Sequence, residues 1–265
     1  MSKQKLTAIV VFDIDGVIRD VSSSYRRAIA DTVEHFTAQA WRPTMEDIDR
    51  LKTEGIWNND WQASQELVYR YFESVGKLRK QINCDYDNMV AFFQDRYRGV
   101  NWDGYIATES LLLSVEYLVQ LSSNYIGWGF FSGATRGSAE YILQQRLGLS
   151  EPVLVAMEDA PGKPDPKGLF MAIAEIETQA VSPIPVLYVG DTVADMYTVI
   201  RAREAIPERT WLAIGILPPH VQTNSQRQND YQQKLIAAGA DIVRPNVEQL
   251  TSDKIRQLSK GGKIT

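Results

Sequence analysis

The segment LTAIVVFDIDGV, residues 6–17, is an apolar, largely β-branched run that ends in two aspartates and a glycine. Such a continuous run predicts a strand buried on both faces, as in a parallel sheet. Ligands of open parallel sheets bind beyond the carboxyl ends of the strands, so Asp13 and Asp15 are candidate catalytic residues. The same Asp-Gly pattern is also common in plain turns. An EF-hand loop does not fit, because its glycine at position six and glutamate at position twelve are missing.

Further apolar runs predict the rest of the sheet at Tyr125–Phe131, Val153–Ala156, Val186–Val189 and Trp211–Ile216, with a weaker strand at Asp241–Val243. Helical patterns lie between most of them, at Ser138–Leu147, Pro166–Ile176, Val193–Ala205 and Tyr231–Ala238. This alternation predicts an α/β fold, a Rossmann-like parallel sheet with helices on both faces. Residues 217–232 are polar and begin with a pair of prolines, which predicts a long exposed loop.

The alternation stops between residues 21 and 105, where helical patterns occur without a strand. Ser22–Ser24 are candidate caps of a first helix, and Thr44 with Asp47 resembles a capping box. Two apolar stripes at helical spacing follow, one at Leu67, Val68, Tyr71, Phe72 and Val75 and one at Met89, Val90, Phe93 and Tyr97. We therefore expect a catalytic core of residues 1–20 and 106–265, with an all-helical insert at 21–105.

The composition of the 265 residues, 44% hydrophobic and 23% charged with a net charge of −5, is typical of a globular protein. It has no basic footprint for nucleic acid and no apolar run of about 20 residues for a membrane span. The only histidines, His35 and His220, lie far apart, which argues against a Ser-His-Asp hydrolase or a multi-histidine zinc site. The single cysteine, Cys84, excludes an intramolecular disulfide and suits a reducing, cytoplasmic compartment. The expected chemistry is that of carboxylates.

A second acidic motif, Gly190-Asp191 followed by Asp195, stands at the end of the strand predicted at Val186–Val189. Two carboxylates placed one helical turn apart could bind a hard cation such as Mg²⁺ through their oxygens. The alternative is that Asp191 caps a helix while Asp195 is solvated.

Two further motifs suit an anion. Lys163 lies in a Gly-Lys-Pro loop before a predicted helix, from which it could reach a phosphate, although a loop lysine is usually just solvated. A Walker loop is excluded, because proline follows the lysine and the glycine spacing is wrong. Ser132 and Gly133 follow the strand predicted at Tyr125–Phe131, where a hydroxyl and backbone amides could bind an anion.

The order D-x-D-G, strand-Ser-Gly, Gly-Lys-Pro and Gly-Asp-x-x-x-Asp, each at a strand end, resembles the four motifs of the haloacid dehalogenase superfamily. The resemblance covers nearly the whole chain. The helical insert resembles the cap of the branch that includes phosphoglycolate phosphatase and β-phosphoglucomutase.

The resemblance implies roles for the motif residues. Asp13 would be the nucleophile that forms an aspartyl-phosphate, and Asp15 the general acid and base. Mg²⁺ would be held by Asp13, the backbone carbonyl of Asp15 and Asp191, while Asp195 orients metal-bound water or the lysine. Ser132, Gly133 and Lys163 would bind the phosphoryl group.

The resemblance also implies a reaction class. An aspartate at position 15 favours a phosphatase acting on a small phosphorylated metabolite, because halide leaving groups need no proton and the dehalogenases lack this residue. A phosphomutase with the same residues and a catalytically silent binding protein are the alternatives. Nothing in the sequence indicates the substrate or the oligomeric state.

Substrate specificity is expected in the insert, where Trp57–Trp61 joins two aromatic residues to three hydrogen-bonding side chains. Asn59, Asp60 and Trp61 are the candidate substrate contacts. Alternatively, Asn59 or Asp60 caps a helix and the tryptophans pack inside the insert.

Overall fold

A computed structural model of the chain describes residues 5–57, 59–177 and 183–261. The chain forms two compact units, which we call the core unit, residues 1–20 and 111–265, and the helical unit, residues 21–110. The sequence placed the second boundary at 105/106, whereas the structure places it at 110/111. The reason is that the 3₁₀ helix η2 (Tyr105–Thr108) packs against α1 (Tyr25–Phe36) and α4 (Tyr86–Tyr97) of the helical unit.

The core unit is built on a six-stranded sheet with the strand order β3-β2-β1-β4-β5-β6. Every neighbouring pair of strands is parallel. The strands are β1 (Ala8–Phe12), β2 (Ile126–Phe131), β3 (Leu154–Val155), β4 (Val186–Gly190), β5 (Trp211–Ile216) and β6 (Ile242–Arg244). The predicted Rossmann-like α/β fold is confirmed.

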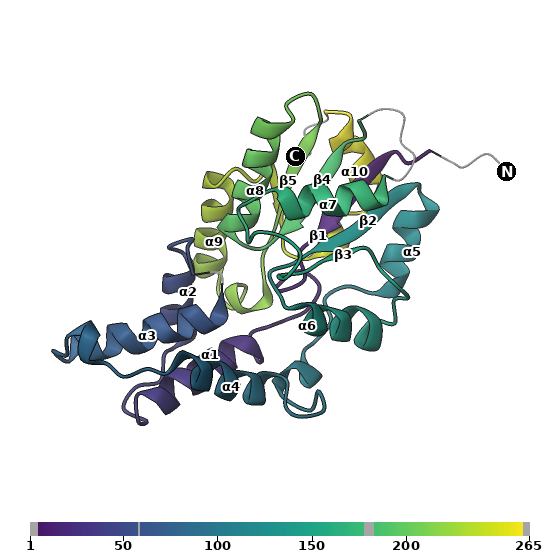
Figure 1. The fold of residues 1–265 in the computed structure, drawn as a ribbon. Helices are drawn as coiled ribbons and strands as arrows, with labels where there is room; N and C mark the ends of the chain where they lie inside the picture. Colours follow the sequence, from purple (N-terminus) through teal and green to yellow (C-terminus); the bar gives the residue numbers. More distant parts are fainter. Residues whose placement is uncertain (1–4, 58, 178–182, 262–265) are drawn as a thin grey trace. The chain divides into compact units, whose positions relative to one another are not determined.

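Helices cover both faces of this sheet (Figure 1). The side chains of β1 show the two layers, because Ile9 and Val11 belong to a core shared with α7, α8 and α9. Phe12 points to the opposite face, where its ring meets that of Tyr117 edge-on at 6.3 Å. The helices of the core unit are α5 (Val115–Ser123), α6 (Arg136–Glu140), α7 (Lys167–Ile176), α8 (Val193–Ala205), α9 (Ser225–Ala237) and α10 (Ser252–Ser259). Shorter turns are the π-helical η3 (Tyr141–Arg146) and the 3₁₀ helices η4 (Pro219–Val221) and η5 (Val247–Gln249). Burial on both faces explains why the strands read as unbroken apolar runs.

The prediction of a long exposed loop at residues 217–232 is wrong. Leu217 and Val221 are buried, and α9 begins at Ser225. The Asn224 side chain caps this helix by accepting a hydrogen bond from the backbone N–H of Arg227. The second half of α9 agrees with the helix predicted at Tyr231–Ala238, whereas residues 225–230 of its first half are all polar, which explains why they were taken for a loop.

The helical unit contains α1, α2 (Met45–Lys52), α3 (Asp60–Ser74), α4 and the short turns η1 (Arg79–Gln81) and η2. Helix α1 packs against α3 and α4, which also contact each other. The predicted stripes supply buried residues, among them Val68 of α3 and Phe93 of α4. Val75 departs from its predicted stripe and is 59% exposed, because α3 ends at Ser74.

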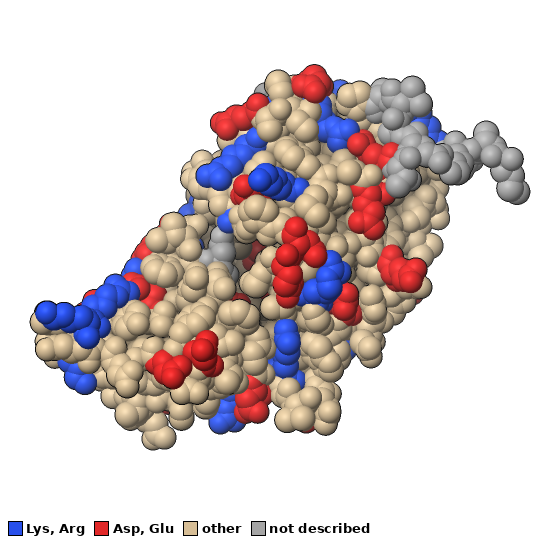
Figure 2. All heavy atoms as spheres, in the orientation of Figure 1, with Lys and Arg blue, Asp and Glu red and all other residues tan. Residues whose placement is uncertain are grey.

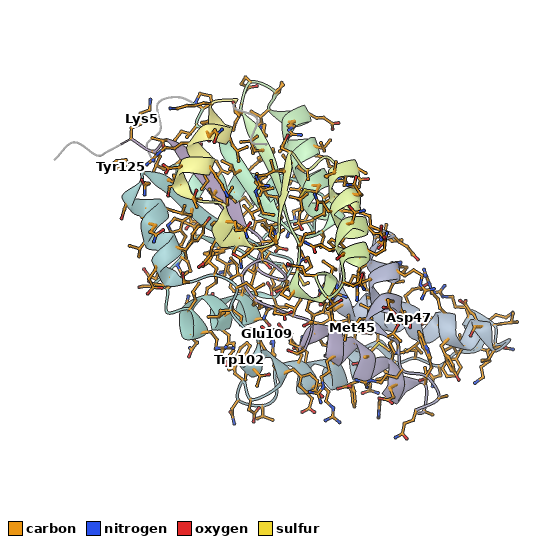
Figure 3. All side chains as sticks on the ribbon, turned by 180° about the vertical axis from the view of Figure 1, so that it is seen from behind. Lys5, Met45, Asp47, Trp102, Glu109 and Tyr125 are labelled. Carbon is orange, nitrogen blue, oxygen red and sulfur yellow. The ribbon has the colours of Figure 1, made fainter. Side chains whose placement is uncertain are left out.

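Helix caps in this unit follow the sequence in one case and depart from it in another. The capping box of Thr44 and Asp47 is confirmed at the start of α2, where Figure 3 labels Met45 and Asp47. Ser24 occupies the N-cap position of α1 without a capping bond from its side chain. Its hydroxyl instead donates to the carbonyl of Val21.

Charged side chains lie in small groups of mixed sign over the face drawn in Figure 2. Ion pairs of the core unit include Arg209 with Glu177, at 2.7 Å, and Arg203 with Asp241. In the part of the chain that the structure describes, no helix has both the length and the apolar character needed to cross a membrane.

Candidate active site

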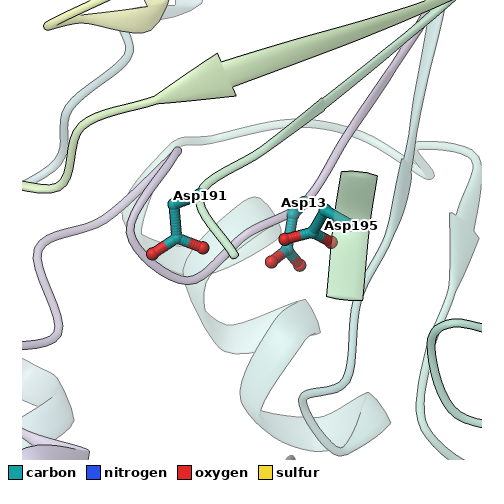
Figure 4. Close-up of side chains that lie close together, drawn as sticks. All are labelled: Asp13, Asp191 and Asp195. Atoms are coloured by element: carbon teal, nitrogen blue, oxygen red, sulfur yellow. The ribbon is translucent and has the colours of Figure 1, made fainter. Parts of the chain in front are cut away.

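Three carboxylates meet at the carboxyl ends of β1 and β4 (Figure 4). Asp13 follows β1, Asp191 follows β4, and Asp195 lies in the first turn of α8. An oxygen of each lies within 4.8 Å of an oxygen of the others. All three residues are buried, with exposed fractions of 6%, 6% and 0%. The pairing of β1 with β4 therefore brings together acids that are almost 180 positions apart in the sequence.

Lys163 joins two of these acids. Its Nζ lies 2.8 Å from Oδ1 of Asp13 and 2.7 Å from Oδ1 of Asp195. The ring centroids of Phe131 and Tyr188 each lie 5.4 Å from the ammonium group. The lysine side chain is only 8% exposed, so the solvated alternative does not apply to it.

Burial controls the charges in this cluster. Loss of solvent is the largest influence and raises the pKa of Asp13; Lys163 lowers it, Asp195 and Asp15 raise it, and together these effects place the pKa at about 7. Burial also disfavours the charged form of Lys163, but Asp13 and Asp195 outweigh this effect and raise the lysine pKa above its ordinary value. The lysine is therefore charged at neutral pH, whereas the Asp13 carboxylate needs more positive charge nearby to be fully ionised.

Asp195 is saturated with hydrogen-bond donors from the protein. Its Oδ1 contacts Lys163 and accepts a hydrogen bond from the Tyr188 hydroxyl at 3.0 Å. Its Oδ2 accepts from the backbone N–H and the hydroxyl of Thr192, at 2.9 and 2.6 Å, in a capping box of α8. Asp195 thus binds the lysine and the start of α8, and with Asp13 and Asp191 it forms a group of carboxylates that could hold a metal ion. The sequence analysis did not identify Tyr188 as a site residue. The only indication was that it places a hydroxyl group within an otherwise apolar strand.

Glycines let the backbone approach the carboxylates. Gly16 has a φ of +74°, and a Cβ at this position would lie 2.1 Å from Oδ2 of Asp191. A Cβ on Gly190 would lie 2.3 Å from the Asp195 side chain. Neither position tolerates a side chain, so the two acidic motifs need their glycines for steric reasons.

Asp15 forms an ion pair with an arginine that sequence reasoning also missed. Its Oδ1 lies 2.7 Å from Nε and 2.6 Å from Nη2 of Arg19. The side chain of Asp15 is 26% exposed, whereas that of Arg19 is fully buried. The available signal was an arginine that follows the apolar pair Val17-Ile18.

Ser132 and Gly133 follow β2, the neighbour of β1, and so lie at the same edge of the sheet as Asp13. Ser132 is buried, and its Oγ accepts a hydrogen bond from the backbone N–H of Ala134 at 3.1 Å. Gly133 is exposed, with no heavy atom within 4 Å of the place a Cβ would occupy. The Cβ side of Gly133 is therefore open.

The predicted specificity segment lies in the helical unit. Asn59 is the N-cap of α3, where its Oδ1 accepts hydrogen bonds from two backbone amides of the first turn. Asp60 forms an ion pair with Lys52 at 2.6 Å. The helix-capping alternative thus holds for Asn59, and a substrate contact of Asp60 or Trp61 stays a prediction. Residue 58 lies outside the described residues.

The family can now be stated. The family model of the haloacid dehalogenase-like hydrolases matches residues 7–203, which include every acid of the site. The chain belongs to this family.

Solved structures with the same fold include several hydrolases of this kind. A phosphonoacetaldehyde hydrolase-like protein from Oleispira antarctica aligns over 100% of this chain and 99% of its own, with a TM-score of 0.69 and 16% identity. A putative β-phosphoglucomutase from Thermotoga maritima aligns over 97% and 99%, with a TM-score of 0.58 and 19% identity. CbbY from Rhodobacter sphaeroides, solved with phosphate, aligns over 92% and 96%, with a TM-score of 0.61 and 15% identity. At these identities the likeness shows the shared fold.

A longer relative carries a different name. A protein of Phytophthora nicotianae called imidazoleglycerol-phosphate dehydratase is 32% identical over 219 residues, which are 82% of this chain. The chain spans only 44% of that protein's length.

Proposed function

We propose that the protein is a Mg²⁺-dependent phosphatase that hydrolyses a small-molecule phosphomonoester through an aspartyl-phosphate on Asp13. The observation that supports this most is the buried group of Asp13, Lys163 and Asp195 beside Asp191. An attacking carboxylate and a phosphate dianion repel each other, so the reaction needs fixed positive charge at this place. Lys163 is such a charge, held by two carboxylates.

The residues divide the reaction into two steps. Asp13 attacks phosphorus, and the ester oxygen leaves with a proton from Asp15. In the second step Asp15 takes a proton from water, which attacks the phosphorus of the aspartyl-phosphate and releases inorganic phosphate. Ser132 and the backbone amides at Gly133 bind the phosphoryl oxygens.

The donor set fits Mg²⁺, which prefers oxygen ligands. Asp13 and Asp191 would hold it together with the backbone carbonyl of Asp15. Burial raises the pKa of Asp13 to about 7 although Lys163 lowers it, so further positive charge at this place would favour the ionised nucleophile. When bound, the ion supplies positive charge that offsets the carboxylate and the phosphoryl oxygens.

A panel of phosphate esters tests the proposal. It should contain sugar phosphates, polyol phosphates and imidazoleglycerol phosphate, the last taken from the relative's name, with detection of free phosphate and of isomerised sugar phosphate. We expect phosphate release that requires Mg²⁺ and stops in EDTA. Isomerisation without release would identify a phosphomutase, and no reaction on any ester would identify a binding protein.

Substitution of the nucleophile separates the mechanism from contaminating activity. Asp13→Asn should abolish turnover and leave the fold intact. Asp253→Asn is the matched control, because this aspartate side chain is 93% exposed, and it should keep full activity. Phosphate release by the Asp13→Asn protein, or full activity in EDTA, would contradict the mechanism.

A further inference from the structure

Arg19 is a buried cation aimed at one atom of the proposed general acid. Both Nε and Nη2 of its guanidinium lie within 2.7 Å of Asp15 Oδ1. A buried guanidinium costs free energy unless it is paired. Stabilising the loop would by itself explain the ion pair. The experiments below are therefore designed to distinguish that structural role from a role in catalysis.

The loop fixes the guanidinium in place. The Ile14 carbonyl accepts hydrogen bonds from the amides of residues 17–19, and the Gly16 N–H donates to the Arg19 carbonyl at 3.0 Å. The Ile18 carbonyl accepts from the N–H of Leu112 at 2.8 Å, which ties the loop to the returning chain of the core unit. Arg19 therefore has an anchored backbone, and Asp15 is held against a rigid partner.

The two oxygens of Asp15 are made unequal by this contact. Oδ1 accepts a hydrogen bond from Nε and lies 2.6 Å from Nη2, so a proton placed on it would face the guanidinium. Among the contacts of the described residues, Asp15 makes none through Oδ2. A proton on Asp15 consequently belongs on Oδ2, and the direction in which Oδ2 points is set by Arg19.

We propose that Arg19 is a positioning residue, which orients Asp15 so that Oδ2 gives its proton to the leaving oxygen and later takes one from water. This inference rests on the proposed phosphatase function and adds a residue outside the four motifs. Arg19 touches neither substrate nor phosphorus in this role and acts only through Asp15.

The test compares two leaving groups in single-turnover experiments. An alkyl phosphate hydrolysed by the wild type needs a proton on its leaving oxygen, whereas p-nitrophenyl phosphate needs little help. General acid catalysis contributes about 10²- to 10⁴-fold, so Arg19→Met should slow the alkyl ester about 10- to 100-fold more than the aryl ester. Arg19→Lys, which keeps the charge but fewer donors, should lose less. A purely structural role predicts equal losses on both esters.

Two further measurements address the route through Asp15. In an Asp15→Asn background, Arg19→Met should slow the alkyl ester by less than about threefold more, because residues that act as a unit are not additive. Guanidinium ion should partly restore the alkyl reaction of Arg19→Ala. If Arg19→Met does not fold, the Lys variant and this rescue decide the question.

Arg209→Met is the matched control, because Arg209 also forms a shielded pair, with Glu177, but precedes β5 and so lies at the other end of the sheet. It should leave the ratio of the two rates unchanged. Equal losses on both esters in the Arg19 variants, additive losses with Asp15→Asn, or no rescue would overturn the inference while the phosphatase stands. A wild type inactive on every ester would refute the phosphatase and this role with it.

Discussion

Removing the Tyr188 hydroxyl tests how much a neutral hydrogen-bond donor stabilises the buried charge of Asp195. This hydroxyl donates to Asp195 Oδ1 at 3.0 Å and lies 3.2 Å from the carbonyl oxygen of Phe131. Tyr188→Phe removes this donor and leaves the ring packed in the core. A hydrogen bond to a charged group contributes about 1.5–3 kcal/mol, so the free energy of unfolding should fall by that amount. The loss should stay below the 3–5 kcal/mol or so of an unpaired buried charge, because Lys163 still contacts the same oxygen.

Equilibrium unfolding in urea measures this loss, with unchanged slopes as the sign that the native state is intact. Tyr117→Phe is the matched control, since this buried hydroxyl donates at 2.9 Å to a neutral acceptor, the Leu250 carbonyl. Its loss should be about 0.5–1.5 kcal/mol. Equal losses in the two variants would refute the claim that the charge on Asp195 strengthens the Tyr188 bond.

Three other substitutions test separate features. Gly16→Ala should destabilise the core unit by more than about 1 kcal/mol, because of the positive φ, and should weaken Mg²⁺ binding through its clash with Asp191; unchanged calorimetric affinity would contradict this. Asn59→Ala should lower the unfolding midpoint by about 1 kcal/mol through the lost cap of α3, with the kcat/KM ratio between esters unchanged; an altered ratio would instead reveal a substrate contact. Hydrogen bonds from Arg70 hold the pKa of Glu54 at about 2, below its ordinary 4.5. The stabilisation from this ion pair is therefore full above pH 4.5 and lost towards pH 2. Glu54→Gln should be less stable than the wild type only at the higher pH, by less than about 1 kcal/mol because the groups are exposed, and thermal unfolding at the two pH values measures this difference.

The parts of the molecule that depend on neighbouring residues in the chain could be predicted from the sequence. The unbroken apolar runs predict β1 and β4, because a strand buried on both faces needs apolar residues at every position. The polar residue that ends each run marks the edge where ligands bind, which is why Asp13 and Asp191 were identified. The capping box of α2 is equally local, since Thr44 and Asp47 are three residues apart.

The contacts that individual side chains make were decided only by the tertiary structure. Asp191 and Asp195 carry the same side chain, and the structure shows that Asp195 is the one that contacts Lys163 and Tyr188. Arg19 contacts Asp15 because a turn over residues 14–19 brings its guanidinium next to the carboxylate. The first half of α9 was missed because residues 225–230 are all polar and carry no apolar stripe; the helix packs through Leu235 in its second half. A hydrogen bond or an ion pair depends on distances in space, and the sequence states only distances along the chain.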